Sequence, residues 1–393
     1  MGYNVILSKS TKTIESPIAI GTYKLTRNSD QVLHVKSELP GPGEDDFQVS
    51  LLWLRDNCRC SECYNEETRQ RKFLVTDLNL NVTARYVTLQ QDLITVLWDD
   101  DHKSTYNLTD LVSNLRPAAT QPEPVLWNAD TIGSLLGHHS ATEVMKESGQ
   151  KRLLHDIFTY GLGIVTGVDP SVEATRSIVT SICPHIRHTL FGDMWEFTDK
   201  PIHADTAYSN QHLDVHTDNT YFYEPSGIQV FHCLRAAEQG GDTLLADGFH
   251  VAALLKQTNK QAYSTLVNMS AEYEYRDGNH HYTAWQSTLS EDPVSGQLNA
   301  VRFNLYDRGP RIPFPTSHRS IKSFFTALQL FAALLHSRGF IYTLRLEPGQ
   351  VLFMNNWRVL HGRTSYRGRR QMTGCYASMG DLMSKARLLK LIR

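Results

Sequence analysis

Two stretches of sequence decide the fold of this chain: His216-Thr-Asp218, and the later segment Asn355-Asn-Trp-Arg-Val-Leu-His361. Two histidines and one carboxylate suit divalent iron and leave three coordination positions open for substrate and dioxygen. Residues two apart on an extended segment share a face, so His216 and Asp218 point the same way. His361 follows His216 by 361 − 216 = 145 residues and must come from another strand. The sequence therefore predicts a β-sheet core that joins distant strands around a metal.

Composition places the chain among ordinary globular proteins and excludes several classes of function. With 393 residues, 41% hydrophobic and 20% charged, it is long enough for one large core or two domains. Lys+Arg total 39 against 41 for Asp+Glu, so no basic surplus indicates a nucleic-acid partner. No apolar run approaches the roughly 20 residues that span a membrane. The six cysteines suggest no disulfide framework, which favours an intracellular compartment, cytoplasmic or mitochondrial.

The order of the expected elements indicates two domains. In residues 1–120 we expect short strands, such as 49–54, because these runs are rich in apolar and β-branched residues. Several prolines make 116–125 the expected linker. Residues 121–393 mix many short strands with helices such as 321–336. This pattern predicts a β-sandwich or barrel core with helices packed outside it.

An arginine cluster follows the second histidine, at Arg363, Arg367, Arg369 and Arg370. An oxygenase that uses 2-oxoglutarate needs one arginine for the remote carboxylate of this co-substrate, because a planar guanidinium binds a carboxylate through two hydrogen bonds. We expect Arg370 in this role, since it precedes an apolar strand that would return beside the metal. The other three arginines are expected in a solvated turn. Thr243, after the turn Gly240-Gly-Asp, could direct its hydroxyl to the same carboxylate.

A second candidate metal site lies near the N-terminus, where Cys58, Cys60 and Cys63 fall within six residues. Clustered cysteines in a reducing compartment favour a metal over three separate thiols. A closed tetrahedral zinc site needs four protein ligands, so one more residue must join from elsewhere. The alternative is a redox-reactive or incidental cluster.

Together these motifs resemble the γ-butyrobetaine/trimethyllysine dioxygenase family, which are non-haem Fe(II), 2-oxoglutarate-dependent hydroxylases. The likeness runs from about Leu52 to the C-terminus and rests on His216-Thr-Asp218, Gly240-Gly-Asp-Thr243, Asn356-Trp-Arg-Val-Leu-His361-Gly-Arg and Arg370. It implies a mixed α+β, mainly β fold. Residues 121–393 would form a double-stranded β-helix (jelly-roll) catalytic core with flanking helices. Residues 1–120 would form a small zinc-binding β domain in front of it.

The resemblance also implies which residues hold the cofactors. His216, Asp218 and His361 would bind Fe(II), and Arg370 with Thr243 would bind 2-oxoglutarate. Ascorbate as a reductant and assembly as a homodimer are further expectations from the family.

For the N-terminal domain the family implies a structural zinc. His102 matches the fourth ligand position, so the expected zinc ligands are Cys58, Cys60, Cys63 and His102. With all four positions filled by protein, this zinc would have no water to activate and would serve structure alone.

The family's substrates carry a trimethylammonium group, a cation without N–H donors that aromatic faces hold best. The resemblance places an aromatic cage on four residues: Trp195, Tyr208, Tyr376 and Phe191. Phe191 stands where the γ-butyrobetaine enzyme has a tyrosine, which keeps the aromatic face and loses a hydroxyl.

Asp205 separates the two substrates of the family. It stands where the γ-butyrobetaine enzyme has an asparagine, and a carboxylate there would repel a lone carboxylate and pair with an α-ammonium group. Asn304 matches a polar position that could hold the substrate carboxylate. We therefore expect hydroxylation of Nε-trimethyllysine at C3 with O2 and 2-oxoglutarate, releasing succinate and CO2, the first step of carnitine biosynthesis.

Several alternatives stay open on the sequence. The substrate could be γ-butyrobetaine or another quaternary amine, such as a trimethylated peptide lysine. A catalytically silent β-helix protein could use the zinc module to bind a partner. A metallohydrolase could use the same metal ligands, although it would leave Arg370 without a role. Asn219, next to the metal pair, could contact substrate or cap a turn.

Overall fold

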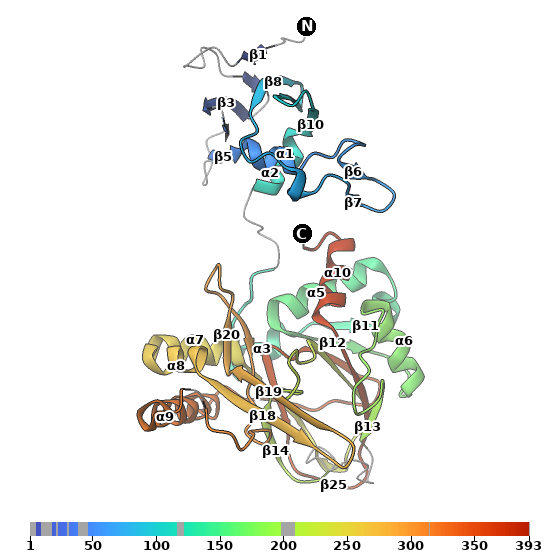
Figure 1. Ribbon diagram of the computed structural model, residues 1–393. Coiled ribbons are helices and arrows are strands. Elements are labelled where there is room, and N and C mark those ends of the chain that lie inside the picture. The colour runs from blue at the N-terminus through green and yellow to red at the C-terminus, as the bar shows by residue number, and fades with distance from the viewer. Residues whose placement is uncertain are drawn as a thin grey trace. The chain divides into compact units, whose positions relative to one another are not determined.

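The structure is a computed structural model that describes most of the chain (Figure 1). The described residues are 5–8, 18–20, 23–29, 31–37, 46–115, 122–197, 209–313 and 315–392. Residues 116–121 of the expected linker lie outside them, as do Asp205 and Tyr208. The chain divides into two compact units, Met1–Ala119 and Thr120–Arg393. Within the described ranges, no helix has the length and apolar character needed to cross a bilayer.

In its described residues the N-terminal unit contains two four-stranded sheets and two short α-helices around one apolar core. The sheets have the orders β1-β8-β9-β10 and β2-β3-β4-β5. Residues two apart, such as Leu33 and Val35 on β4 or Val87 and Leu89 on β8, turn the same way into this core. The elements are β1 Val5–Ser8, β2 Ile18–Ile20, β3 Tyr23–Ser29, β4 Val32–Ser37, β5 Asp46–Ser50, α1 Leu51–Asp56, β6 Tyr64–Asn65, β7 Gln70–Arg71, the 3-10 helix η1 Val75–Asp77, β8 Ala84–Gln90, β9 Leu93–Trp98, β10 Lys103–Asn107 and α2 Leu108–Leu115.

The expected strand 49–54 is wrong in its second part. Strand β5 ends at Ser50, and helix α1 begins at Leu51. The Ser50 hydroxyl accepts a hydrogen bond from the backbone N–H of Trp53 and so caps the helix. A short apolar run can be buried as a strand or as a helix, and the serine cap favours the helix here.

The C-terminal unit is a sandwich of two sheets with helices on its outer faces (Figure 1). One sheet has the order β11-β12-β23-β15-β26-β13, and the other has the order β14-β24-β17-β22. The helices are α3 Ala129–Leu135, α4 Ala141–Val144, α5 Glu147–Tyr160, α6 Val172–Ile182, α7 Gly248–Thr258, α8 Lys260–Asn268, α9 His318–Leu335 and α10 Met379–Leu388. The strands are β11 His138–Ser140, β12 Leu162–Thr166, β13 Trp195–Phe197, β14 Leu213–His216, β15 Ile228–Arg235, β16 Gln239–Gly240, β17 Thr243–Asp247, β18 Ser270–Arg276, β19 His281–Ser287, β20 Leu289–Glu291, β21 Leu298–Val301, β22 Tyr342–Leu344, β23 Val351–Asn355, β24 Val359–Arg363, β25 Tyr366–Arg367 and β26 Gln371–Ala377.

Alternation along the strands separates three apolar layers. Between the sheets, Cys233 of β15 and Leu245 of β17 belong to one cluster. On the outside of the larger sheet, Val230 packs with Leu382 and with residues of α5 and α6. On the outside of the smaller sheet, Leu244 packs with α7, α8 and α9. The inner layer is therefore enclosed on both sides, and polar groups that point into it are shielded from water.

A buried ion pair and the hydrogen bonds of its arginine join four segments at the edge of this core. Arg358, in the turn between β23 and β24, donates to both carboxylate oxygens of Asp247, with Nε–Oδ1 at 3.0 Å and Nη2–Oδ2 at 2.8 Å. It also donates to the main-chain carbonyls of Thr159 at 2.8 Å and Val125 at 2.6 Å. Both charged side chains are fully buried, so each depends on the other for compensation.

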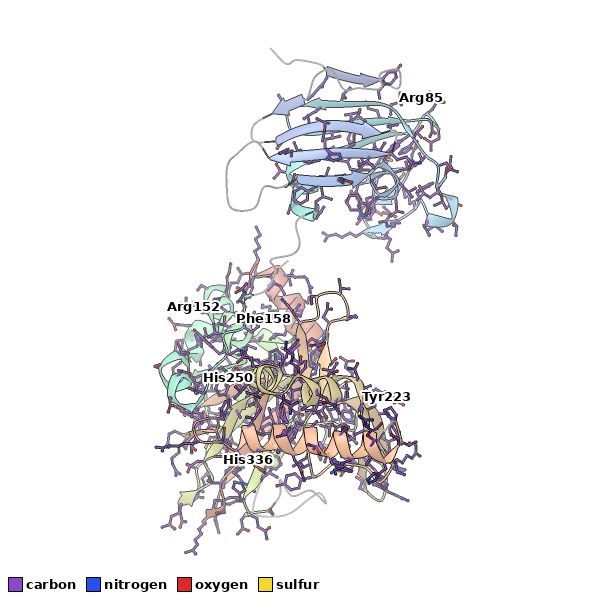
Figure 2. The ribbon with its side chains drawn as sticks, turned by 90° about the vertical axis from the view of Figure 1, so that its left-hand side faces the viewer. Arg85, Arg152, Phe158, Tyr223, His250 and His336 are labelled. Atoms are coloured by element: carbon purple, nitrogen blue, oxygen red, sulfur yellow. The ribbon has the colours of Figure 1, made fainter. Side chains whose placement is uncertain are left out.

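Replacement of Arg358 should destabilise the unit strongly. Arg358→Met should lower the free energy of unfolding by about 3–5 kcal/mol, because it leaves the Asp247 carboxylate buried without its counter-ion. The matched control is Arg152→Met (Figure 2), which removes an exposed ion pair with Glu143 at 3.4 Å and should cost less than about 1 kcal/mol. Urea unfolding measures both. Equal, small losses would contradict the structural role of the buried pair.

Candidate functional site

Two neighbouring strands bring the expected metal ligands together. His216 ends β14 and pairs directly with His361 on the antiparallel strand β24. Alternation along β24 turns His361 to the same side as Val359, into the layer between the sheets, where its ring lies 5.2 Å from that of Phe231. Asp218 follows two residues after His216. The register of two strands thus joins ligands that lie far apart in the sequence.

The three side chains converge on one point. The Nε2 of His216 lies 3.1 Å from Oδ1 of Asp218, and the Nε2 of His361 lies 3.8 Å from the same oxygen. All three ligand atoms lie within 4.8 Å of one another. Metal bonds of about 2.1 Å at right angles place neighbouring donors roughly 3 Å apart. The donor set and its spacing fit a divalent iron.

The two oxygens of the Asp218 carboxylate have different neighbours. Its Oδ2 accepts hydrogen bonds from Nε2 of Gln229 at 2.5 Å and from the hydroxyl of Tyr376 at 2.6 Å. Its Oδ1 therefore faces the two imidazoles. Sequence reasoning missed Gln229 and this role of the Tyr376 hydroxyl. The two residues lie opposite each other on β15 and β26, and no local pattern shows that register.

The ionisation of the histidines suits metal binding. Burial lowers the pKa of His216, but the hydrogen bond and negative charge of Asp218 outweigh it and raise this pKa to about 9. Burial lowers the pKa of His361 to about 3. Asp218 thus favours a positive charge on the His216 imidazole, whereas burial favours the neutral form of His361. A divalent cation would replace the proton on His216 and compensate the same carboxylate.

The turn after Asp218 is held by buried side chains. The Oδ1 of Asn356 accepts a hydrogen bond from the backbone N–H of Asp218 at 2.8 Å. Its Nδ2 donates to the backbone carbonyls of Asp218 and Ser226, at 3.0 and 2.9 Å. Asn219 has a left-handed backbone, with φ of 58°, and its buried side chain accepts the Ser226 hydroxyl at 2.7 Å. Of the two roles considered for Asn219, these contacts favour stabilisation of the turn.

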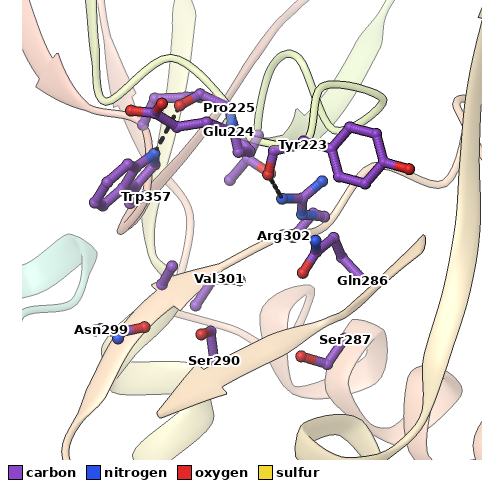
Figure 3. A pocket seen from close by; sticks show the side chains of 13 residues that line it. Tyr223, Glu224, Pro225, Gln286, Ser287, Ser290, Asn299, Val301, Arg302 and Trp357 are labelled. Atoms are coloured by element: carbon purple, nitrogen blue, oxygen red, sulfur yellow. Dashed lines mark hydrogen bonds between the residues drawn. The ribbon is translucent and has the colours of Figure 1, made fainter. Parts of the chain in front are cut away.

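Arg302 holds the next part of the same segment. It donates to the main-chain carbonyls of Thr220, Phe222 and Tyr223, at 2.5, 2.8 and 3.2 Å. Its side chain lines a pocket of about 310 Å³ together with Gln286 and Trp357 (Figure 3). The Trp357 Nε1 donates to the carbonyl of Pro225 at 3.0 Å. These contacts fix the backbone that follows the metal-binding pair.

The expected 2-oxoglutarate residues lie at one end of the sandwich. Burial, and then the charge of Arg363, lower the pKa of Arg370 to about 10. Gly241, with φ of 75°, lies so close that a Cβ there would be 3.2 Å from Cδ of Arg370, and both residues line a small cavity. Thr243 is buried at the start of β17. Within the described ranges no carboxylate lies at ion-pair distance from Arg370, and the nearby charge of Asp242 raises its pKa by less than burial lowers it. A bound anion would compensate this buried charge.

The other arginines of the cluster do not all lie in a solvated turn. Arg367 and Arg369 are exposed, but that expectation is wrong for Arg363. Arg363 is the last residue of β24 and is buried. Its Nη2 donates to the carbonyls of Ser209 and Gln211 at 2.8 and 2.7 Å. The strand runs past the histidine and carries this side chain inward with it.

Two of the expected cage residues lie together beside Asp218. The ring of Trp195 on β13 lies 6.0 Å from that of Tyr376, whose hydroxyl binds Asp218. Trp195 pairs with Gly374 of β26, where a Cβ would come within 2.1 Å of the indole. A glycine at this position therefore makes the room for the indole.

The other described candidates have different neighbours. The Phe191 ring lies 6.2 Å from that of Tyr275, edge to face, in a separate cluster of aromatic residues. The Asn304 side chain donates to the Asp307 carboxylate at 2.9 Å and accepts the backbone N–H of Tyr306 at 2.9 Å. An amide has a second N–H, so Asn304 can still donate to a ligand.

The N-terminal cysteines form a second group that could hold a metal, together with His102. The Sγ atoms of Cys58, Cys60 and Cys63 lie 3.4, 3.6 and 3.5 Å from Nε2 of His102. Tetrahedral zinc with bonds of about 2.3 Å to sulfur and 2.0 Å to nitrogen places these atoms roughly 3.5 Å apart. Arg55 donates to the Cys63 sulfur at 3.5 Å. The spacing fits the expected zinc set.

Comparisons with known proteins agree with this geometry. Residues 131–376 match the "Taurine catabolism dioxygenase TauD, TfdA family", and residues 27–112 match "Gamma-butyrobetaine hydroxylase-like, N-terminal". A Homo sapiens protein named "Trimethyllysine dioxygenase, mitochondrial" is 35% identical, over 88% of this chain and 83% of its own length. The Homo sapiens "Gamma-butyrobetaine dioxygenase" is 26% identical, over 88% of this chain and 92% of its own length.

Similarity to a solved structure supports the fold but carries no information about function. The crystal structure of AAD-2 in complex with Mn(II) and N-oxalylglycine matches with a TM-score of 0.50 and 12% identity, over 66% of this chain and 97% of that chain. The family and the enzyme class expected from the sequence are confirmed. The chain belongs to the TauD, TfdA family, carries a γ-butyrobetaine hydroxylase-like N-terminal domain, and is an Fe(II)- and 2-oxoglutarate-dependent dioxygenase.

Proposed function

We propose that this dioxygenase hydroxylates Nε-trimethyllysine at C3 with O2 and 2-oxoglutarate, releasing succinate and CO2, as the first step of carnitine biosynthesis. The contact between Tyr376 and Asp218 carries the proposal, because it puts an aromatic face one hydrogen bond from the metal-facing carboxylate. Trp195 extends that face. Each face would hold a trimethylammonium group by about 0.5–2 kcal/mol. The higher identity to the human trimethyllysine dioxygenase, 35% against 26%, supports this substrate over γ-butyrobetaine.

In this proposal the cofactors take the positions implied by the motifs. His216, Asp218 and His361 hold the iron, which supplies the oxidising power when bound. Arg370, with the Thr243 hydroxyl, binds the remote carboxylate of 2-oxoglutarate. The protein orients the reactants and excludes water, and the surrounding sandwich is a double-stranded β-helix. Ascorbate as reductant, a homodimer and a mitochondrial or cytoplasmic location stay predictions.

Two polar residues would bind the α-ammonium and carboxylate groups of the substrate. We propose that Asp205 pairs with the α-ammonium and that the second N–H of Asn304 donates to the carboxylate. Tyr208 and Phe191 would complete the cage around the other end. The charge-assisted contact to Asp205 distinguishes trimethyllysine from γ-butyrobetaine, which has no ammonium at that end.

A parallel assay tests the substrate and the role of Asp205. With Fe(II), ascorbate and 2-oxoglutarate, mass spectrometry should show one added oxygen on trimethyllysine and a matching amount of succinate. Asp205→Asn should lower kcat/KM for trimethyllysine by roughly 10–100-fold, since a charged hydrogen bond contributes about 1.5–3 kcal/mol, and should spare γ-butyrobetaine. Product from γ-butyrobetaine alone would refute the substrate. Equal losses on both substrates would refute the role of Asp205.

Tyr376→Phe separates the aromatic face from the hydroxyl. The ring stays, but Asp218 loses one of its two Oδ2 donors, so activity should fall by about 10–100-fold while KM for trimethyllysine changes little. Tyr263→Phe is the matched control, because it removes only a hydrogen bond to Glu291 away from the site. Steady-state kinetics of both variants measure kcat and KM separately. A rise in KM with unchanged kcat would mean that the hydroxyl binds substrate instead.

We also propose that Cys58, Cys60, Cys63 and His102 bind one structural zinc. Cys60→Ser should remove zinc from the purified chain and lower the melting temperature, because binding to such a site contributes directly to folding. Cys183→Ala removes a buried cysteine of the catalytic unit and should retain the metal. Elemental analysis gives the zinc content of each variant. Full zinc in Cys60→Ser would contradict the assignment.

A further inference from the structure

The peptide between Asp214 and Val215 is held at both ends. Its carbonyl accepts a hydrogen bond from Nδ1 of His216 at 2.7 Å. Its N–H donates to Oδ1 of the Asp214 side chain at 2.8 Å. The orientation of this peptide therefore controls the direction in which His216 presents Nε2, the atom that faces Asp218.

The backbone of β14 is irregular at this place. The register with β24 shifts between Leu213 and His216. A Cβ on Gly362, the residue after His361, would lie 2.6 Å from the Leu213 carbonyl and 3.0 Å from the Val215 nitrogen. The bulged segment thus lies directly against β24, and glycine is what permits that approach. Residues 213–215 cannot move closer to β24. The hydrogen bond from the Val215 N–H to the Asp214 side chain therefore controls how the 214–215 peptide is oriented.

His336 follows the last turn of α9 (Figure 2), and its ring holds the Asp214 side chain. Its Nε2 lies 2.8 and 2.9 Å from the two carboxylate oxygens of Asp214, and its Nδ1 lies 2.7 Å from the Ala332 carbonyl. Both ring nitrogens face acceptors, so both carry protons and the ring is an imidazolium. Phe331 and Leu335 anchor α9 in the apolar core. A rigid element thereby extends to the metal ligand through a short series of hydrogen bonds.

We propose that His336 is a positioning residue for the metal centre: it fixes the Asp214 carboxylate, which fixes the 214–215 peptide, which aims the His216 imidazole. The inference rests on the proposed role of His216 as a metal ligand. Neither His336 nor Asp214 contacts the substrate or the metal in this scheme. Loss of His336 frees the Asp214 carboxylate to turn towards water and release the Val215 N–H.

Metal affinity tests the proposal without any turnover. Full-length protein with its zinc retained and its iron removed is titrated with Mn(II), and free Mn(II) is followed by electron paramagnetic resonance. His336→Ala should raise the Kd for Mn(II) by roughly 10-fold, the size of effect seen when partners of metal ligands are removed. His336→Gln keeps a donor for Asp214 and should recover most of the affinity.

The control is His281→Ala, since His281 is a similarly exposed histidine whose Nε2 lies 2.7 Å from Glu274 on β18. Its Mn(II) affinity should match wild type. A Kd for His336→Ala within twofold of wild type would overturn the inference, and so would failure of His336→Gln to improve on alanine. If His216→Ala binds Mn(II) as well as wild type does, the proposed metal site itself is wrong. That outcome is distinct from an unchanged Kd in His336→Ala, which would overturn only the positioning role of His336.

Discussion

The catalytic unit depends on the pairing of His216 with His361 across β14 and β24. Side chains alternate along a strand, so a slip of one residue would turn one of these ligands to the other face of the sheet. The close approach of Leu213 to Gly362 holds the register, because only a residue without Cβ fits there. The other contacts of the site depend on this alignment. They include those that the two carboxylate oxygens of Asp218 make.

Around that pair, buried polar groups keep the site in one arrangement. Asn356 and Arg358 flank a single residue in the turn before His361, and each binds a different part of the fold. Asn356 holds the backbone of Asp218, whereas Arg358 compensates Asp247. Burial of such groups costs free energy unless they are paired, so alternative packings of this turn are disfavoured. The motif that contains His361 is thus structural over most of its length.

Local patterns predicted elements well where a segment carries its own signal. The expected helix 321–336 is α9, which begins earlier, at His318, because the Ser317 side chain caps it by accepting the backbone N–H of Ser320. The expected strand 49–54 failed for the same kind of reason, a serine cap within an apolar run. Arg363 was assigned to a solvated turn because its spacing to the next strand does not reveal that β24 continues as far as this residue.

The sequence by itself determined the ligand chemistry: which histidines, carboxylate and cysteines are available, their order, and the arginine that follows them. It determined the family as well, since each of those motifs is a short local stretch of sequence. Only the tertiary structure decided that Gln229 and Tyr376 share one oxygen of Asp218, and that His336 reaches His216 through Asp214. Such contacts depend on strand register and on the packing of distant segments. No short-range periodicity in a sequence encodes those distances.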